Sequence, residues 1–456
     1  MQLDTIVIGS GQAGVPLATR LAAAGQQVLL AERGELGGTC TNTGCTPTKT
    51  MIASARAAHV ARTAARLGVR AGPVEVDLRA VVARKDAMVA RWRAGVEKSL
   101  AKAGERLRLV RGAARFVGER EVEVAGERHR AATVVVNVGA RPVVPPVDGL
   151  ERVPWLDNHR VMELTAVPEH LIIIGGGYIG CEFGQMFRRF GARVTIVDPG
   201  SHLLDRSDPE ISEALGEVFR GEGIELVFGQ RARRVEGGGG AVRVTLEDGT
   251  TLAGSHLLVA TGRRPNTDDL ACDAAGVALD ERGFVRVDDR YATSAAGVYA
   301  VGDVTGGPQF THTSWDDHRI LYDVLQGRPA RSRSGRVIPF TAFTDPPVAG
   351  VGLTEREARE RGIPHLVGKM PFGQVARAIE TDERAGVMKL LVDPESERIL
   401  GAAIVGAEAG ELIHVFAVLM QAKASARALV DVETVHPTYS EGLQTLVMSI
   451  DRFALQ

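Results

Sequence analysis

The sequence is poor in cysteine for its length and has no excess of charge of either sign. Four cysteines occur in 456 residues, at positions 40, 45, 181 and 272, too few for a framework of structural disulfides. A reducing cytoplasm is therefore the expected compartment. With 54 Lys and Arg against 56 Asp and Glu, the formal net charge is -2. This balance gives no reason to expect nucleic acid or an anionic membrane as a partner.

Long apolar runs are also missing from the sequence. No stretch approaches the ~18 consecutive apolar residues of a membrane-spanning helix. The N-terminus, MQLDTIVIGSGQAG, has no basic region before its apolar residues, so we expect no targeting segment. The chain exceeds the ~250–300 residues at which a single core stops growing, so two or three domains are predicted.

What the sequence does contain is a repeated glycine pattern that predicts two strand–helix–strand units. LDTIVIGSGQAG and HLIIIGGGYIG are apolar runs that end in glycines, and each precedes a helical pattern and a further β-branched run. Glu32 follows Gly9 at the same spacing as Asp198 follows Gly175. A second repeat, TVVVNVGARP and HLLVATGRRP, predicts the strand that ends each unit.

These landmarks predict an α/β fold with two Rossmann-like dinucleotide-binding domains and a C-terminal α+β domain. Residues 1–149 would form the first domain, and residues 150–264 would be inserted as the second. The strand in GVYAVGDV would then return the chain to the first domain, which residues 265–335 complete. Residues 336–456 contain strand and helix patterns without glycine fingerprints, so they would form the α+β domain.

Each glycine pattern suits a bound dinucleotide, because glycines let a pyrophosphate approach a helix N-terminus and an acidic residue can bind a ribose diol. The predicted binding residues are Gly9, Gly11, Gly14 and Glu32 in the first unit and Gly175, Gly177, Gly180 and Asp198 in the second. The alternative is that both patterns are merely structural turns. Two sites imply one tightly bound flavin and one exchangeable nicotinamide. Asp198 would repel a 2′-phosphate, so NAD(H) is favoured over NADP(H).

Two of the cysteines, Cys40 and Cys45, lie close together in GGTCTNTGCTPTKT. On a regular helix this spacing rises ~7.5 Å, too far for a disulfide. Gly44 and Pro47 would let the first helical turn distort. A helix N-terminus would also favour a reactive thiolate. Half of a metal site is the alternative, but the spacing is uncommon for zinc and no second cysteine pair is available, so no metal is predicted.

Three motifs together resemble the class I pyridine nucleotide–disulfide oxidoreductases, which include lipoamide dehydrogenase, glutathione reductase and mercuric reductase. They are GGTCTNTGCTPTKT, VYAVGDV and VHPTYSEG, and the resemblance covers essentially the whole chain. It implies FAD as the flavin, a Cys40–Cys45 redox disulfide, and a homodimer formed through the C-terminal domain. Gly139 and Gly262, in the second repeat, and Asp303, at the ribityl-binding position, would complete the cofactor sites.

The resemblance also implies catalytic roles. Cys45 would be the thiolate nearest the flavin, and Cys40 the thiol that exchanges with substrate. His436 would be the general acid–base for Cys40, a task that suits an imidazole near neutral pH, with Glu441 orienting it. In the family this pair comes from the other subunit, so the active site is shared. Lys49 and Glu182 match an ion pair beside the reactive flavin nitrogen.

The substrate is the least determined property. The main hypothesis is a small disulfide or dithiol, as for a dihydrolipoamide dehydrogenase or a small disulfide reductase. The segment GDVTGGPQFTHTSWDDHRI looks like a mercuric-reductase-like branch, but no cysteine follows Cys272 to collect metal. The alternatives are therefore a flavoreductase of Hg or Cu ions, quinones or oxygen with the cysteines in a secondary role, or a non-catalytic scaffold. The physiological direction of the reaction stays open.

Overall fold

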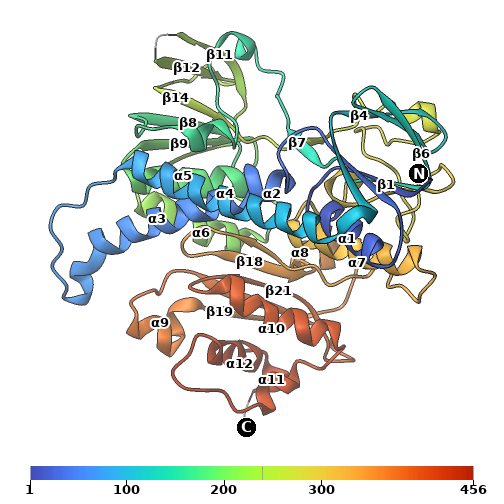
Figure 1. The fold of residues 1–456 in the computed structure, drawn as a ribbon. Helices are drawn as coiled ribbons and strands as arrows, with labels where there is room; N and C mark the ends of the chain where they lie inside the picture. Colours follow the sequence, from blue (N-terminus) through green and yellow to red (C-terminus); the bar gives the residue numbers. More distant parts are fainter. Residues whose placement is uncertain (1, 239, 455–456) are drawn as a thin grey trace. The chain divides into compact units, whose positions relative to one another are not determined.

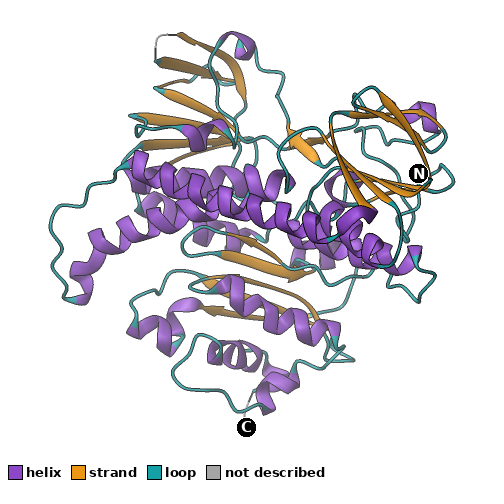
Figure 2. Cartoon of the chain, in the orientation of Figure 1, coloured by secondary structure: helices purple, strands orange, loops and turns teal. Residues whose placement is uncertain are grey.

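The structure is a computed structural model that describes residues 2–238 and 240–454 (Figures 1 and 2). The chain divides into two compact units. Unit 1 comprises Met1–Met51, Ala80–Val143 and Gly262–Arg336, and unit 2 comprises Ile52–Arg79, Val144–Thr261 and Val337–Gln456. None of the helices in the described ranges has the length and apolar character that crossing a membrane requires.

The elements alternate between strands and helices over most of the chain. The helices are α1 (Gly14–Ala23), α2 (Gly38–Asn42), α3 (Cys45–Thr63), α4 (Leu78–Lys102), α5 (Tyr178–Phe190), α6 (Pro209–Gly221), α7 (Thr311–Leu325), α8 (Glu355–Glu360), α9 (Ala376–Glu380), α10 (Ala409–Gln421), α11 (Arg427–Asp431) and α12 (Glu441–Met448). The strands are β1 (Leu3–Ile8), β2 (Val28–Glu32), β3 (Leu107–Arg111), β4 (Ala114–Gly118), β5 (Glu121–Val124), β6 (Glu127–Val136), β7 (Ala140–Pro142), β8 (His170–Ile174), β9 (Arg193–Asp198), β10 (Glu225–Phe228), β11 (Ala232–Gly238), β12 (Ala241–Leu246), β13 (Thr251–Gly254), β14 (His256–Val259), β15 (Arg263–Pro265), β16 (Val298–Ala300), β17 (Phe340–Ala342), β18 (Val348–Gly352), β19 (Leu366–Pro371), β20 (Val387–Val392) and β21 (Ile399–Val405).

The main sheet of unit 1 has the parallel order β3-β2-β1-β6, and β16 also pairs with β6 in parallel. The last four residues of β1 are buried, as expected for a parallel strand covered on both faces. The pairing of β16 confirms the prediction that GVYAVGDV completes the first sheet. The antiparallel strands β5 and β4, which continue the sheet beyond β6, were not predicted.

Unit 2 contains the second parallel sheet, with the order β10-β9-β8-β14. Every residue of β8 is buried, so the apolar run HLIII has the same physical origin as β1. Both predicted strand–helix–strand units, β1-α1-β2 and β8-α5-β9, are confirmed. A separate antiparallel sheet, β11-β12-β13, was not predicted from the sequence.

The C-terminal part of unit 2 is built on an antiparallel sheet with the order β17-β18-β21-β20-β19. Helix α10 packs on β18 and β21, and α12 packs on β19 and β20 (Figure 1). This arrangement confirms the predicted α+β character. Strand β19 was missed by the sequence analysis, because Gly, Lys and Pro interrupt the apolar residues of its sequence LVGKMP.

Lys389 is a charged residue in β20, all six residues of which are buried. Its side chain is 2% exposed, and its Nζ lies 3.0 Å from Asp208 Oδ2, 2.8 Å from Glu210 Oε1 and 2.6 Å from Glu355 Oε2. Burial opposes the charge, but hydrogen bonds with the three carboxylates raise the pKa of Lys389 above its ordinary value. The buried ammonium therefore ties α6 and α8 to β20, since an unpaired charge would be costly there.

Asn137, the residue after β6, braces the carboxyl edge of the sheet in unit 1. Its side chain is buried; Oδ1 accepts from Gly14 N at 2.9 Å, and Nδ2 donates to Val301 O at 3.0 Å. Its backbone N donates to Ile8 O at 2.8 Å. One amide side chain thus joins the start of α1 to the segment that follows β16.

Replacing Asn137 with Ala should destabilise unit 1, because Gly14 N and Val301 O lose their partner in a buried position. A loss of about 2 kcal/mol or more is expected, from roughly 1–3 kcal/mol for each unpaired buried group. Urea unfolding of the flavin-free protein, followed by circular dichroism, measures this loss. Asn266→Ala is the matched control: Asn266 also makes two side-chain bonds but is only half-buried. Equal losses for the two variants would contradict the bracing role.

Candidate active site

The first glycine turn, between β1 and α1, has a shape that larger residues cannot adopt. Gly9 has a φ of +106°, and a Cβ there would overlap the carbonyl oxygen of Asn137. A Cβ at Gly14 would overlap the carbonyl oxygen of Gly9. Glu32, at the end of β2, accepts from Ser10 N at 2.8 Å and from Ser10 Oγ at 2.7 Å. The turn therefore combines bare backbone at a helix N-terminus with a flanking carboxylate.

The second glycine turn, between β8 and α5, repeats this geometry position by position. Gly175 has a φ of +111°, and a Cβ there would overlap the carbonyl oxygen of Ala260. A Cβ at Gly180 would overlap the carbonyl oxygen of Gly175. Asp198 Oδ2, at the end of β9, accepts from Gly176 N at 2.6 Å. The internal repeat read from the sequence is thus also a repeat in three dimensions.

The second oxygen of each acidic residue is held in the same way. Gly34 N donates to Glu32 Oε1 at 2.7 Å, and Gly200 N donates to Asp198 Oδ1 at 2.7 Å. Both carboxylates are therefore fixed at the edge of their turns, where a ribose diol can reach them when a pyrophosphate lies on the helix N-terminus. The residues of both turns fit a dinucleotide.

The two turns differ at their middle glycine. A Cβ at Gly11 would lie 3.1 Å from Asn137 Oδ1. At Gly177, none of the described residues has a heavy atom within 4 Å of that point. The difference arises because Asn137 and Ala260 occupy equivalent positions of the second sequence repeat, and only Asn137 extends an amide into its turn.

The second repeat forms a short ribbon in unit 1. Gly139, with a φ of +67°, precedes β7, and Gly262, with a φ of +125°, precedes β15. These strands pair with each other in antiparallel fashion. Arg263 Nη1 donates to Asp303 Oδ2 at 2.5 Å, so the ribbon is tied to the predicted ribityl-binding residue.

The two predicted redox cysteines lie on either side of a break between two helices. Cys40 belongs to α2, which ends at Asn42, and Cys45 is the first residue of α3. Gly44 lies at the break, and a Cβ there would come within 2.9 Å of Thr39 O. The break brings the two thiols into hydrogen-bonding contact, which the spacing would not allow on one regular helix.

Cys45 is the more exposed of the two cysteines. Its Sγ lies 3.0 Å from Thr311 Oγ1, and it stands at the N-terminus of a 19-residue helix, where negative charge is favoured. The pKa of the Cys40 thiol is raised well above its ordinary value by the hydrogen bond to Cys45, by burial and by the charge of Cys45. Thr311 and Lys49 oppose this shift. The helix N-terminus therefore favours negative charge on Cys45, while the raised pKa of Cys40 keeps that thiol protonated.

The other two cysteines are buried and have no comparable surroundings. Cys181 Sγ donates to Gly176 O at 3.3 Å, and burial raises the pKa of its thiol well above the ordinary value. Burial raises the pKa of Cys272 to about 11. Both thiols would stay protonated and unreactive near neutral pH.

Lys49 and Glu182 are each held near the start of a helix. Lys49 lies in α3, one turn after Cys45, in unit 1. Glu182 lies in α5 in unit 2; it is 6% exposed, and its Oε1 accepts from Phe343 N at 2.9 Å.

His436 and Glu441 form a hydrogen-bonded pair in unit 2. His436 Nδ1 lies 2.9 Å from Glu441 Oε2. The imidazole side chain is 70% exposed, whereas the carboxylate is 18% exposed. Glu441 is the first residue of α12, and its backbone N donates to Thr438 Oγ1 at 3.3 Å. The carboxylate thus holds one ring nitrogen and leaves the other ring nitrogen available for proton transfer.

Two residues of this site were missed by the sequence analysis because their importance comes from tertiary contacts. Thr311, at the start of α7, reaches Cys45 from a segment distant in sequence. Asp317, one turn and a half later, accepts from Gly302 N at 2.9 Å and from Tyr291 Oη at 2.5 Å. The sequence analysis names the segment that contains Thr311 and Asp317 but assigns no role to either residue.

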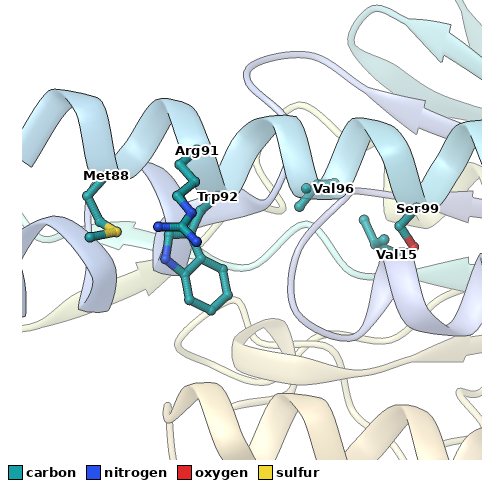
Figure 3. Close-up of a pocket in the computed structure, with 7 residues that line it drawn as sticks. Val15, Met88, Arg91, Trp92, Val96 and Ser99 are labelled. Atoms are coloured by element: carbon teal, nitrogen blue, oxygen red, sulfur yellow. The ribbon is translucent and has the colours of Figure 1, made fainter.

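A shallow apolar groove of about 560 Å³ runs between α1 and α4 in unit 1 (Figure 3). Its lining includes Val15, Met88, Val96 and the exposed ring of Trp92. Among the described residues that line it there is no thiol, carboxylate or imidazole. The groove is therefore separate from the catalytic groups.

The chain matches known proteins along nearly its whole length. Residues 3–317 match the family model described as pyridine nucleotide-disulphide oxidoreductase, and residues 338–447 match the dimerisation domain of that family. A dihydrolipoyl dehydrogenase of Thermus scotoductus is 36% identical over 99% of this chain and 98% of its own. A mercuric reductase of Lysinibacillus sphaericus is 35% identical over 98% of this chain and 83% of its own.

A solved structure also superimposes closely. It is the Cu(II) complex of the HOCl-induced flavoprotein disulfide reductase RclA from Escherichia coli, with a TM-score of 0.90 and 34% identity over 98% of this chain and 99% of that one. These matches agree with the two nucleotide turns, the thiol pair and the C-terminal α+β domain. The chain is an enzyme of the pyridine nucleotide-disulphide oxidoreductase family.

Proposed function

We propose that the enzyme is a homodimer that uses FAD to pass an electron pair between NADH and a small disulfide or dithiol, through Cys40 and Cys45. The observation that carries this proposal is the thiol pair at the start of α3, in hydrogen-bonding contact with each other and with Thr311. A dihydrolipoamide dehydrogenase or a small disulfide reductase would use such a pair.

The cofactor assignment rests on the two turns. The first, with Glu32, Gly139 and Asp303, would hold FAD, and the second, with Asp198, would hold the nicotinamide dinucleotide. FAD, when bound, would accept a hydride from the nicotinamide and pass the electron pair to the Cys40–Cys45 disulfide. NADH is favoured over NADPH because Asp198 is fixed at the edge of its turn by Gly176 N and Gly200 N. A fixed carboxylate would repel a 2′-phosphate.

The two thiols would divide the exchange reaction. Cys40, once deprotonated, attacks one sulfur of a substrate disulfide; a mixed disulfide forms and the other substrate sulfur leaves as a thiolate, which takes up a proton. The Cys45 thiolate then attacks Cys40 Sγ. This step re-forms the Cys40–Cys45 disulfide and releases the second substrate thiol. The raised pKa of Cys40 means that the reaction needs a base to begin.

His436 would be that base, and it would return the proton to the leaving thiolate. Glu441 holds its Nδ1, which leaves Nε2 to exchange the proton. The dimerisation domain contains both residues, and we propose that they act on the thiols of the other subunit. The 70% exposure of the imidazole supports this, because a partner subunit can reach it.

The proposal extends to an ion pair, the domain bounds and the compartment. Lys49 and Glu182 would form an ion pair beside the flavin, where the cation would stabilise negative charge. The domains would comprise residues 1–149 with 265–335, residues 150–264, and residues 336–456. The small number of cysteines, four in 456 residues, suits a reducing cytoplasm.

A second candidate is a flavoreductase of metal ions such as Hg or Cu, or of quinones or oxygen. The similarity to a mercuric reductase and to a copper complex of RclA favours it. In that reaction Cys40 and Cys45 would be secondary.

Anaerobic titration with NADH tests the main proposal. In the wild type we expect a broad absorbance band beyond the flavin peak, which marks a thiolate next to the flavin. Cys45→Ser should abolish the band, and Cys40→Ser should keep it, because Cys45 carries the charge. Loss of the band in Cys40→Ser alone would show that the two roles are reversed.

The double variant, with Ser at both positions, separates the two candidate functions. A disulfide reductase should lose all NADH-dependent reduction of lipoamide. A direct flavoreductase should keep most of its NADH–quinone activity and show no dependence on either thiol for its physiological reaction.

Thr311→Val should move the appearance of the absorbance band to higher pH. The Thr311 hydroxyl, 3.0 Å from Cys45 Sγ, would stabilise the Cys45 thiolate by hydrogen bonding. Without this hydroxyl, the thiolate should form only at a higher pH. A shift of about 1–2 pH units is expected, from roughly 1.5–3 kcal/mol for a hydrogen bond to a charged group and 1.36 kcal/mol per unit. A pH titration of the reduced enzyme measures it. Thr311→Ser keeps the hydroxyl and should behave as the wild type. Equal shifts of the pH midpoint in Thr311→Val and Thr311→Ser would contradict the role of this hydroxyl.

Asp198→Asn should raise the preference for NADPH. The amide keeps an oxygen that can accept from the turn but removes the charge that would repel a 2′-phosphate. The ratio of kcat/KM for NADPH to that for NADH should rise about tenfold, which corresponds to ~1.4 kcal/mol. An unchanged ratio would show that Asp198 does not discriminate between the two nucleotides.

A further inference from the structure

Tyr439 anchors the turn that presents His436. Its ring stacks on Phe372 with centroids 5.8 Å apart, and Phe372 is fully buried. Its hydroxyl donates to Glu383 Oε2 at 2.6 Å and lies 2.8 Å from Thr381 Oγ1. Two neighbouring residues are, in contrast, mostly exposed to solvent: Val435 is 75% exposed and the His436 side chain is 70% exposed. The turn therefore meets the body of the domain through this phenol.

The carboxylate beneath the phenol is itself held in place. Arg56 Nη2, on α3, donates to Glu383 Oε1 at 3.1 Å. Arg56 Nε also lies 3.8 Å from Asp345 Oδ2, and Asp345 pairs with the buried Arg189 of α5 at 2.6 Å. Glu383 is thus bound on both oxygens, one by Tyr439 and the other by Arg56. A carboxylate held in this way gives the phenol a fixed partner.

The turn itself is closed by short-range hydrogen bonds, which connect its residues to one another. Thr438 Oγ1 donates to Val435 O at 2.8 Å, and Gly442 N donates to Tyr439 O at 3.2 Å. His436 is bonded to Glu441 at the end of the same turn. Any shift of the turn would therefore carry the imidazole with it.

We propose that Tyr439 is a positioning residue for the His436–Glu441 pair. Through its hydrogen bond to Glu383, the Tyr439 hydroxyl fixes the distance of the imidazole from the surface of the domain. This proposal rests on the proposed thiol function, in which His436 exchanges a proton with Cys40. A misplacement of about 1 Å can cost a proton-transfer step on the order of 100-fold. The reduction of the enzyme by NADH, which does not use His436, would be unaffected.

Tyr439→Phe is the direct test, because Phe keeps the ring on Phe372 and removes only the hydroxyl. With NADH and lipoamide, kcat should fall between ~10-fold and ~100-fold, while the rate of reduction by NADH stays within about twofold of the wild type. Glu383→Gln weakens the partner of the phenol without changing any residue of the turn, and should reproduce part of the loss. Tyr322→Phe is the control of equal size, since that ring lies under Arg20 in unit 1, 3.7 Å from the guanidinium carbon.

A double-mutant cycle with His436→Ala separates positioning from general damage. If Tyr439 acts through His436, Tyr439→Phe should cause no further loss of lipoamide reduction in the His436→Ala background. An equal loss in both backgrounds, or no loss in the wild-type background, would overturn the proposal. If His436→Ala alone leaves lipoamide reduction unchanged, the acid–base role of His436 is wrong, and the positioning role of Tyr439 is wrong with it. This result differs from the two outcomes above, which contradict only the positioning role.

Discussion

A backbone carbonyl at the end of one strand determines the geometry of each nucleotide turn. The carbonyl oxygen of Asn137 occupies the space that a side chain at Gly9 would need, and that of Ala260 does the same at Gly175. The chain can pass this point only with a left-handed glycine, after which a helix begins. The acidic residue at the end of the next strand then accepts hydrogen bonds from the turn. The shape of both glycine turns depends on this steric constraint.

Much of this arrangement could be predicted from the sequence because it follows from local chemistry. The glycine spacing, the acidic residues and the buried strands β1 and β8 were all readable, since each depends on residues a few positions apart. The break between α2 and α3 was anticipated from Gly44 and Pro47. Contacts between residues that are far apart in the sequence could not be predicted. Thr311 reaches Cys45 across the fold of unit 1, and Lys389 reads as an ordinary strand residue until three carboxylates from other segments surround it.

The thiol pair shows how one contact can make two identical side chains chemically different. The hydrogen bond to Cys45, burial and the charge of Cys45 all raise the pKa of Cys40. The helix N-terminus and the Thr311 hydroxyl favour the charge on Cys45. Cys40 would be left as a protonated thiol, so the proposed mechanism through this pair needs a separate base, for which we propose His436. The asymmetry is thus built into the position of the pair at the start of α3.

The difference between Asn137 and Ala260 bears on the history of the two nucleotide sites. Two sites with such similar geometry are what a gene duplication would produce. Immediately after the duplication, both copies would release their ligands at the same rate. The amide of Asn137 supports the first turn from inside, by accepting a hydrogen bond from Gly14 N. Ala260 offers its own turn no such support. The two turns therefore differ, at one position of the repeat, in whether a side chain supports them.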